Sequence, residues 1–195
     1  GAKRPFARSS SGRRTDLSAK TSSLSGDPAG RQIAAREASS LTPTAGASHH
    51  APMKRVLFLC TGNYYRSRYA EELFNHLARA ENLPWRALSR GAAERGSPDN
   101  VGAMSVFADR RLRASGIVPE GATRYPQPCS LADFDGADLV IALKEAEHRP
   151  LVERRFPEVA ERVTYWHVHD IDVADPAVAL PMIDDLVRGL VSSLS

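Results

Sequence analysis

Cys60 opens the stretch CTGNYYRS (60–67), which brings a thiol, a glycine, an asparagine and an arginine into eight consecutive residues. The five residues between Cys60 and Arg66 are enough for a loop whose N–H groups converge on one point. A helix that follows such a loop adds its own free N–H groups and the positive end of its dipole. The spacing therefore predicts a cradle for a tetrahedral oxyanion.

Each residue type in this cradle has its own task. Gly62 permits a main-chain turn that other residues resist, and Arg66 can bind two phosphate oxygens at once. The positive field favours a thiolate at Cys60, which would attack a bound phosphorus in line and form a cysteinyl-phosphate. Ser67 could donate a hydrogen bond to the Cys60 sulfur, and Asn63 could brace the loop. The predicted phosphate-binding residues are Thr61, Gly62, Asn63, Tyr64, Tyr65, Arg66 and Ser67.

The elements that position this loop follow from the hydrophobic pattern. RVLFL (55–59) is a short apolar run typical of a strand buried on both faces. The segment YAEELFNHLARA (69–80) carries one apolar stripe, as a helix does. Further strands are predicted over 85–91, 137–143 and 162–168. Helices are predicted from Ser97-Pro98 to Gly116, over 144–156 with Pro150 as a potential break, and over 178–194.

Strands that alternate with helices imply right-handed crossovers and a parallel sheet, so the predicted fold class is α/β. In such sheets ligands bind outside the carboxyl ends of the strands. CTGNYYRS follows the first predicted strand and precedes the first helix, so it lies at that edge. This placement favours a catalytic cysteine over a buried structural one.

The composition is that of an ordinary globular protein. The chain has 195 residues, of which 42% are hydrophobic and 25% charged. No apolar run approaches the roughly 20 residues that span a bilayer. Two cysteines cannot build a disulfide framework, so we expect a reduced, cytoplasmic protein.

The basic charge is concentrated in residues 1–52, which carry eight Lys and Arg against three Asp and Glu. This Ser- and Arg-rich segment has few large apolar residues, so we expect it to be disordered. It is interpreted as an extension or a cloning remnant because Met53 directly precedes the first predicted strand. Its composition also resembles that of an organelle transit peptide. The predicted domain organisation is a disordered extension over 1–52 and a catalytic domain over 53–195.

VLFLCTGNYYRS, with AEELF after it, resembles the low-molecular-weight protein tyrosine phosphatases and the related arsenate reductases. Their pattern is a hydrophobic strand followed by C-x-G-N-x-C-R-S. The resemblance implies a Rossmann-like or flavodoxin-like three-layer sandwich with a four-stranded parallel sheet. It also implies metal-free, cofactor-free hydrolysis of phosphate monoesters. In ALSRG (87–91), Ser89 would be the serine that hydrogen-bonds the loop asparagine.

The chain departs from the family pattern at two places. Tyr65 stands where the family has a second cysteine, so a protective disulfide with the nucleophile should be absent. Tyr64 and Tyr65 could wall the pocket and stack on an aryl substrate, or could pack against neighbouring loops. The tyrosine that often follows the family's late Asp-Pro is also missing.

A general acid must protonate the leaving group, and the family uses an aspartate in a late loop. Three aspartates in YWHVHDIDVADP are candidates: Asp170, Asp172 and Asp175. We favour Asp170 because its distance from the preceding tryptophan fits the family spacing, although Ile171 replaces the proline. Asp175 keeps the Asp-Pro dipeptide but lies five residues further on. Asp175 and Asp172 therefore stay open as alternatives.

His167 and His169 alternate along a predicted strand end, with Asp170 next to them, and invite a metal interpretation, but no further ligands cluster nearby in sequence. We therefore predict no metal. The expected partners are a phosphorylated protein or a small phosphate ester, with no nucleic acid or membrane, and the oligomeric state is open. One alternative function is arsenate reduction with an external thiol, because Cys129 is the one further cysteine. The other is a phosphate-binding module that has lost turnover.

Overall fold

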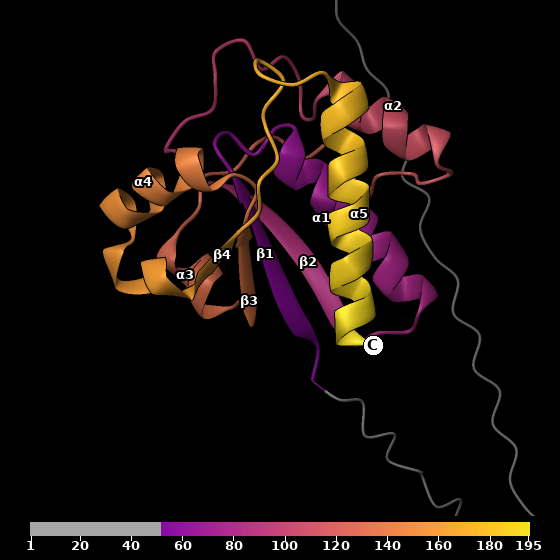
Figure 1. Ribbon diagram of the computed structural model, residues 1–195, viewed down its shortest axis with the longest axis horizontal. Coiled ribbons are helices and arrows are strands. Elements are labelled where there is room, and N and C mark those ends of the chain that lie inside the picture. The colour runs from indigo at the N-terminus through magenta and orange to yellow at the C-terminus, as the bar shows by residue number, and fades with distance from the viewer. Residues whose placement is uncertain (1–51) are drawn as a thin grey trace, which may run out of the picture. The chain divides into compact units, whose positions relative to one another are not determined.

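The computed structural model describes residues 52–195, and the predictions made for residues 1–51 lie outside the described residues. The elements in chain order are β1 (Lys54–Cys60), α1 (Arg66–Ala80), β2 (Trp85–Gly91), α2 (Val106–Ala114), α3 (Leu131–Asp135), β3 (Leu139–Ala142), α4 (Glu145–Arg155), the 3-10 helix η1 (Pro157–Arg162), β4 (Val163–Tyr165) and α5 (Pro176–Leu194). Strands and helices alternate along most of the chain (Figure 1). None of the helices in this part of the chain is long and apolar enough to cross a membrane.

The four strands form one parallel sheet in the order β2-β1-β3-β4, which confirms the predicted fold. Strand β1 is central, and its last five residues are buried because both faces of the sheet are covered. The register pairs Cys60 with Gly91 and Leu59 with Ala142, and Ala142 pairs in turn with Tyr165. The carboxyl ends of all four strands therefore meet at one edge.

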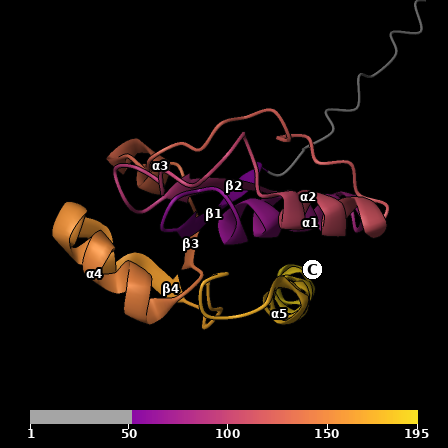
Figure 2. The same ribbon diagram turned by 90° about the horizontal axis from the view of Figure 1, so that it is seen from above.

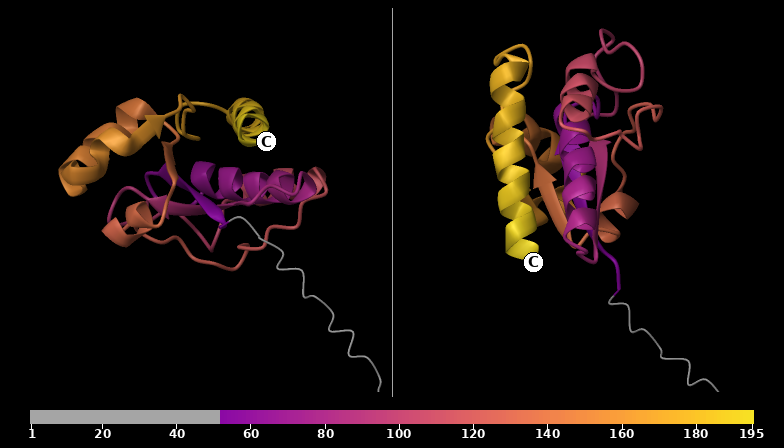
Figure 3. Two further views of the ribbon diagram at one scale, coloured as in Figure 1. Left: turned by 90° about the horizontal axis from the view of Figure 1, so that it is seen from below. Right: turned by 90° about the vertical axis from the view of Figure 1, so that its right-hand side faces the viewer.

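Two hydrophobic cores cover the two faces of the sheet. Val56 and Phe58 point into a core shared with α1, α2 and α5. Leu57 and Leu59 point into a second core that includes residues of α3, α4 and η1. Figure 2 shows α3 and α4 on one side of the sheet and α1, α2 and α5 on the other, and Figure 3 shows α5 running beside α1. The three layers hold β1, and with it Cys60, rigidly at the centre.

One predicted helix boundary is wrong. The helix expected to start at Ser97-Pro98 begins at Val106, and residues 97–105 form a loop. Ser97 closes a single turn in which its carbonyl accepts from the Asn100 N–H and its hydroxyl accepts from the Asp99 N–H. Gly102 then takes φ +84°, which ends any helical continuation. The signal at Ser97 marked an isolated turn.

The other boundaries differ less. Strand β4 ends at Tyr165, although the N–H groups of Trp166 and Val168 still donate to carbonyls at the end of β3 and just beyond it. Pro150 lies inside α4 and does not divide it. The short elements α3 and η1 were not predicted, because five or six residues carry too little periodicity to be detected.

Candidate active site

The loop between β1 and α1 has the predicted strand–loop–helix form. Strand β1 ends at Cys60 and α1 begins at Arg66. A side chain at Gly62 would place its Cβ 3.1 Å from the Cα of Gly96, so the close approach of these two loops favours glycine. Gly62 has no positive φ, and the expected turn that other residues resist is therefore not found there. Asn63 adopts φ +52°, a left-handed conformation that asparagine tolerates better than most residues.

The main chain of the loop carries unused hydrogen-bond donors. Within the described part of the chain, the main-chain N–H groups of residues 62–67 donate to no main-chain acceptor. The Cys60 sulfur lies at the base of the loop, 3.0 Å from the Ser67 hydroxyl. Free N–H groups at a helix N-terminus form a binding site for an anion. A bound oxyanion would therefore lie directly against the sulfur.

The convex side of the loop is held by buried side chains. The Asn63 amide donates to Ser89 Oγ at 2.8 Å and to Ser67 Oγ at 3.3 Å. Its carbonyl oxygen accepts the N–H of Gln127 at 3.0 Å. Ser89 in turn donates to Glu71 at 2.5 Å, and Arg124 donates to both Ser89 and Glu71. We call these six residues the rear network; it fixes the loop conformation from behind.

Arg66 is 1% exposed and has three partners on the other side of the loop. Its Nη1 donates to the Val168 carbonyl at 3.0 Å, and its Nη2 donates to Glu147 at 2.6 Å and to Asp170 at 2.7 Å. Its Nε is buried and has no partner among the described residues. Burial lowers the pKa of Arg66, but the hydrogen bond to Glu147 and the nearby Cys60 and Asp170 outweigh burial, so the net shift is upward. The guanidinium is therefore charged and oriented.

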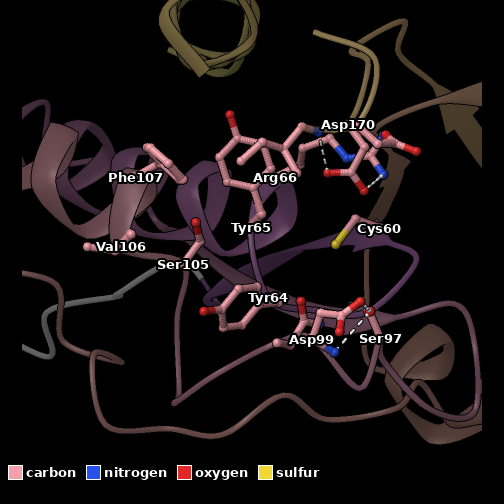
Figure 4. Close-up of a pocket in the computed structure, with 14 residues that line it drawn as sticks. Cys60, Tyr64, Tyr65, Arg66, Ser97, Asp99, Ser105, Val106, Phe107 and Asp170 are labelled. Carbon is pink, nitrogen blue, oxygen red and sulfur yellow. Dashed lines mark hydrogen bonds and ion pairs between the residues drawn. The ribbon is translucent and has the colours of Figure 1, made fainter. Parts of the chain in front are cut away.

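Cys60 and Arg66 open onto a pocket of about 570 Å³ (Figure 4). Its lining residues come from the loops that follow β1, β2 and β4, together with the start of α2. They are Cys60, Gly62, Tyr64, Tyr65, Arg66, Ser97, Asp99, Asn100, Ser105, Val106, Phe107, Asp170, Ile171 and Asp172. The pocket therefore lies at the carboxyl edge of the sheet, as predicted from the sequence.

The three candidate acids occupy different positions. Asp170 lines the pocket, is 33% exposed and pairs with Arg66. Asp172 also lines the pocket, and no side-chain partner for it is found among the described residues. Asp175 caps α5, where its carboxylate accepts the Ala177 N–H at 2.7 Å, and it is not part of the pocket wall. The geometry thus favours Asp170 over both alternatives.

Both tyrosines of the motif line the pocket and also pack against neighbouring segments. Tyr64 donates its hydroxyl hydrogen to the Val101 carbonyl at 2.7 Å, which ties the motif loop to the loop after β2. Tyr65 belongs to the core beneath α1 and is 5% exposed. Burial, assisted by the charge of Asp170, raises the pKa of Tyr65 to about 12. Tyr64 therefore both lines the pocket and packs against a neighbouring loop, and stacking on an aryl substrate stays a prediction.

His167 and His169 do not converge on Asp170. Their Nε2 atoms both lie 3.1 Å from Nζ of the buried Lys144, which stands between them as a donor. Asp170 turns instead to Arg66. Among residues 52–195, no three side chains of His, Cys, Asp or Glu are grouped as metal ligands.

Several positions of the candidate site were not found from the sequence. Glu147, whose carboxylate holds Arg66, lies 81 residues from it in the chain. The pocket-lining residues within 97–107 were missed because this segment was predicted to be the start of a helix. A signal for Glu147 did exist, because it lies in the first turn after β3, at the same sheet edge as Cys60.

A parallel α/β sheet whose central strand ends in a cysteine-to-arginine loop is the architecture of a class of cysteine-dependent phosphatases. The sequence model of one family of this class, the low molecular weight phosphotyrosine protein phosphatase, matches residues 55–181. The chain belongs to this family, and the resemblance drawn from the motif is confirmed.

Solved structures agree with this assignment. The low molecular weight protein tyrosine phosphatase from T. tengcongensis is 28% identical, with a TM-score of 0.62 over 72% of this chain and 99% of that one. The YwlE arginine phosphatase from Geobacillus stearothermophilus is 27% identical, with a TM-score of 0.57 over 72% and 92%. Vibrio vulnificus Wzb in complex with benzylphosphonate shares the fold at 16% identity, with a TM-score of 0.62 over 73% and 99%. No curated protein sequence gave a match.

Proposed function

We propose that this protein hydrolyses phosphate monoesters through a cysteinyl-phosphate intermediate, with phosphotyrosine in proteins as its substrate. One observation carries the proposal. Cys60, the buried Arg66 and three loop residues whose N–H groups have no main-chain acceptor (Gly62, Tyr64 and Tyr65) all line one pocket. A thiolate next to an anion site is placed to attack the bound phosphorus.

The first chemical step forms the S–P bond at Cys60 and breaks the P–O bond to the leaving group. Arg66 binds the non-bridging oxygens, and Asp170 gives its proton to the leaving oxygen. In the second step Asp170 takes a proton from water, which attacks the phosphorus and releases inorganic phosphate and the Cys60 thiolate. Ser67 assists this departure by donating to the sulfur at 3.0 Å.

The pocket wall supports an aromatic substrate. Tyr64, Val106, Phe107 and Ile171 supply apolar surface around the opening, against which an aryl ring can pack. Phosphoarginine is a second candidate, because similarity to the YwlE arginine phosphatase nearly equals that to the tyrosine phosphatase. Asp99 and Asp172 at the rim would attract its guanidinium. Turnover of a phosphotyrosine peptide and a phosphoarginine peptide of the same sequence separates the two.

Arsenate reduction stays an alternative only with an external thiol. An internal relay would need Cys129 as a second thiol, yet Cys129 is buried and its main chain is tied to Gly91. Burial, assisted by the charge of Asp133, raises the pKa of the Cys129 thiol to about 12, which makes it a poor nucleophile at neutral pH. A coupled thiol-oxidation assay with arsenate tests this alternative. A cytoplasmic location and the absence of nucleic-acid binding stay predictions.

Turnover of an aryl phosphate in the presence of a metal chelator tests the proposal. We expect hydrolysis by the wild type and none by Cys60→Ser, together with a phosphorylated Cys60 in an acid-quenched sample analysed by mass spectrometry. Cys129→Ser is the matched control and should keep full activity. Hydrolysis that survives in Cys60→Ser would refute the mechanism. Binding of phosphate without turnover would indicate the binding module instead.

A further inference from the structure

One nitrogen of Arg66 serves two carboxylates. Nη2 donates one hydrogen to Glu147 at 2.6 Å and the other to Asp170 at 2.7 Å. A guanidinium binds an oxyanion in a bidentate way along one of two edges, Nε with Nη2 or Nη1 with Nη2. Both edges include Nη2. With both of its hydrogens occupied, Arg66 offers no complete edge to a phosphoryl group.

The two carboxylates are not equivalent with respect to the pocket. Asp170 lines the pocket together with Cys60, whereas Glu147 does not belong to its wall. The Arg66 Nε, buried and without a partner in the described residues, is the donor left over for a ligand. A phosphoryl group that enters beside Cys60 therefore meets the hydrogen bond of Asp170 and not that of Glu147. Figure 4 shows Asp170 lying against Arg66 at this side of the pocket.

Glu147 is held in its position independently. It lies in the first turn of α4, where the helix dipole favours a negative charge. His148 stands behind it and is fully buried, with Nε2 3.7 Å from the Glu147 carboxylate. The Nδ1 of His148 accepts the Lys144 N–H, so the neutral ring carries its proton on Nε2, facing Glu147. The His148 Nε2 has no hydrogen-bond partner among the described residues, so the helix dipole and the short bond from Arg66 are what keep Glu147 in place while the pocket fills.

We propose that Arg66 Nη2 keeps its hydrogen bond to Glu147 throughout the reaction and exchanges its hydrogen bond to Asp170 for one to the substrate. This inference rests on the proposed function. Glu147 is a positioning residue that orients the guanidinium throughout the reaction. Asp170 occupies Nη2 until the phosphoryl group arrives, and the oxyanion then replaces Asp170 on Arg66. Substrate binding therefore releases the proton donor at the moment when the leaving group needs it.

The exchange has a chemical consequence. In the free enzyme the Asp170 carboxylate is an ion-pair partner of Arg66. Once the oxyanion has replaced it there, the carboxyl takes a proton from solvent and delivers that proton to the leaving oxygen. The P–O bond cleavage consumes the proton of Asp170, and attack by water restores it. The same carboxyl therefore serves both steps without returning to Arg66 between them.

Direct binding of inorganic phosphate, measured by titration calorimetry, tests this division. The variants are Asp170→Asn, Glu147→Gln and Asp172→Asn, each of which removes one negative charge with little change in size. We expect Asp170→Asn to bind phosphate at least about fivefold more tightly, because the competitor for Nη2 is lost. Asp172→Asn, a pocket carboxylate without a contact to Arg66, should change affinity less than twofold.

Glu147→Gln should not tighten phosphate binding, since it weakens the anchor and leaves Asp170 in place. A general charge effect would instead tighten all three variants by similar factors, and that result would overturn the proposal. So would unchanged affinity in Asp170→Asn, with its melting temperature used to verify folding. The assay needs no turnover. Failure of aryl phosphate hydrolysis would refute the function while leaving the division of Nη2 between the two carboxylates intact.

Discussion

The two sides of the motif loop use the same kinds of side chain in opposite ways. Behind the loop, the rear network joins Asn63 to its neighbours through buried hydrogen bonds that leave the Asn63 amide and the Ser89 hydroxyl with protein partners. In front, Arg66 keeps a buried Nε without a partner in the described residues and shares Nη2 with Asp170, which is 33% exposed. The Arg124 Nε of the rear network also lacks a partner among the described residues, but no residue of that network lines the pocket. A network closed off from the pocket keeps one arrangement, whereas one that borders the pocket can exchange a protein partner for a ligand.

If this contrast holds, substitutions on the two sides of the loop should have different effects on stability and on activity. Changes behind the loop should lower the free energy of unfolding and should affect activity through loop position. Changes in front should affect binding and turnover with little loss of stability. A variant that behaves in the opposite way would break the comparison.

The largest effect is expected for Arg66→Lys. An ammonium is a compact point charge, and it cannot replace the planar fork that binds two oxygens and fixes their orientation. We expect kcat/KM for an aryl phosphate to fall by roughly 10²–10³-fold, the range seen when one transition-state donor is removed. Retention of more than a tenth of wild-type kcat/KM would contradict the role assigned to Arg66.

Asp170→Ala and Asp175→Ala form a matched pair in the same late loop. Loss of the acid should slow hydrolysis of an ester with a poor leaving group by about 10²-fold, and by much less for a good leaving group. Loss of the helix cap should leave turnover unchanged and lower the free energy of unfolding by about 1 kcal/mol. Steady-state kinetics with phenyl and nitrophenyl phosphate, together with urea unfolding, measure both. Equal losses of turnover in the two variants would count against Asp170 as the acid.

Much of the front of the site could be predicted because its parts are local in sequence. Cys60, Gly62, Asn63, Arg66 and Ser67 lie within eight residues, between a strand and a helix whose periodicities are strong. The same pattern fixed the order of strands and helices, and hence the sheet edge.

The remaining parts of the site depend on contacts that no local pattern encodes. Glu147 and the Val168 carbonyl reach Arg66 across 81 and 102 residues, and the Gln127 N–H reaches Asn63 across 64. A main-chain group has no signature in the sequence at all. The loop over 97–105 was misread because Ser97-Pro98 begins a turn as readily as a helix. The resemblance to the family supplied Ser89, which local reasoning alone would have passed over.

Ser89→Ala tests the rear network. Ser89 accepts from Asn63 and Arg124 and donates to Glu71, so its removal takes one hydrogen bond from the buried Asn63 and Glu71 and from the half-buried Arg124. We expect the free energy of unfolding to fall by about 2 kcal/mol, and kcat to fall by about tenfold because the loop loses its fixed position. Urea unfolding and steady-state kinetics measure the two. Unchanged stability combined with a large loss of phosphate binding would place Ser89 with the front of the loop.

The smallest effect is expected for His148. It is fully buried, like the centre of the rear network, yet it faces Glu147, which holds Arg66 on the pocket side of the loop. Burial, helped by the charge of Arg66, lowers the pKa of His148 from 6.5 to about 3. In this range the unfolded chain takes up a proton that the folded one refuses, so stability is full above pH 6.5 and falls as the pH drops toward 3.

The resulting loss should reach about 1 kcal/mol at pH 5.5 relative to pH 7. His148→Asn keeps an acceptor for the Lys144 N–H but cannot titrate. Its stability should be lower than that of the wild type at pH 7 because a smaller side chain leaves a cavity. Its decline between pH 7 and pH 5.5 should nevertheless be shallower by that same amount in urea unfolding. Parallel declines in the two proteins would mean that His148 takes up its proton in the folded state, and that the contact facing Glu147 is more open to water than its burial implies.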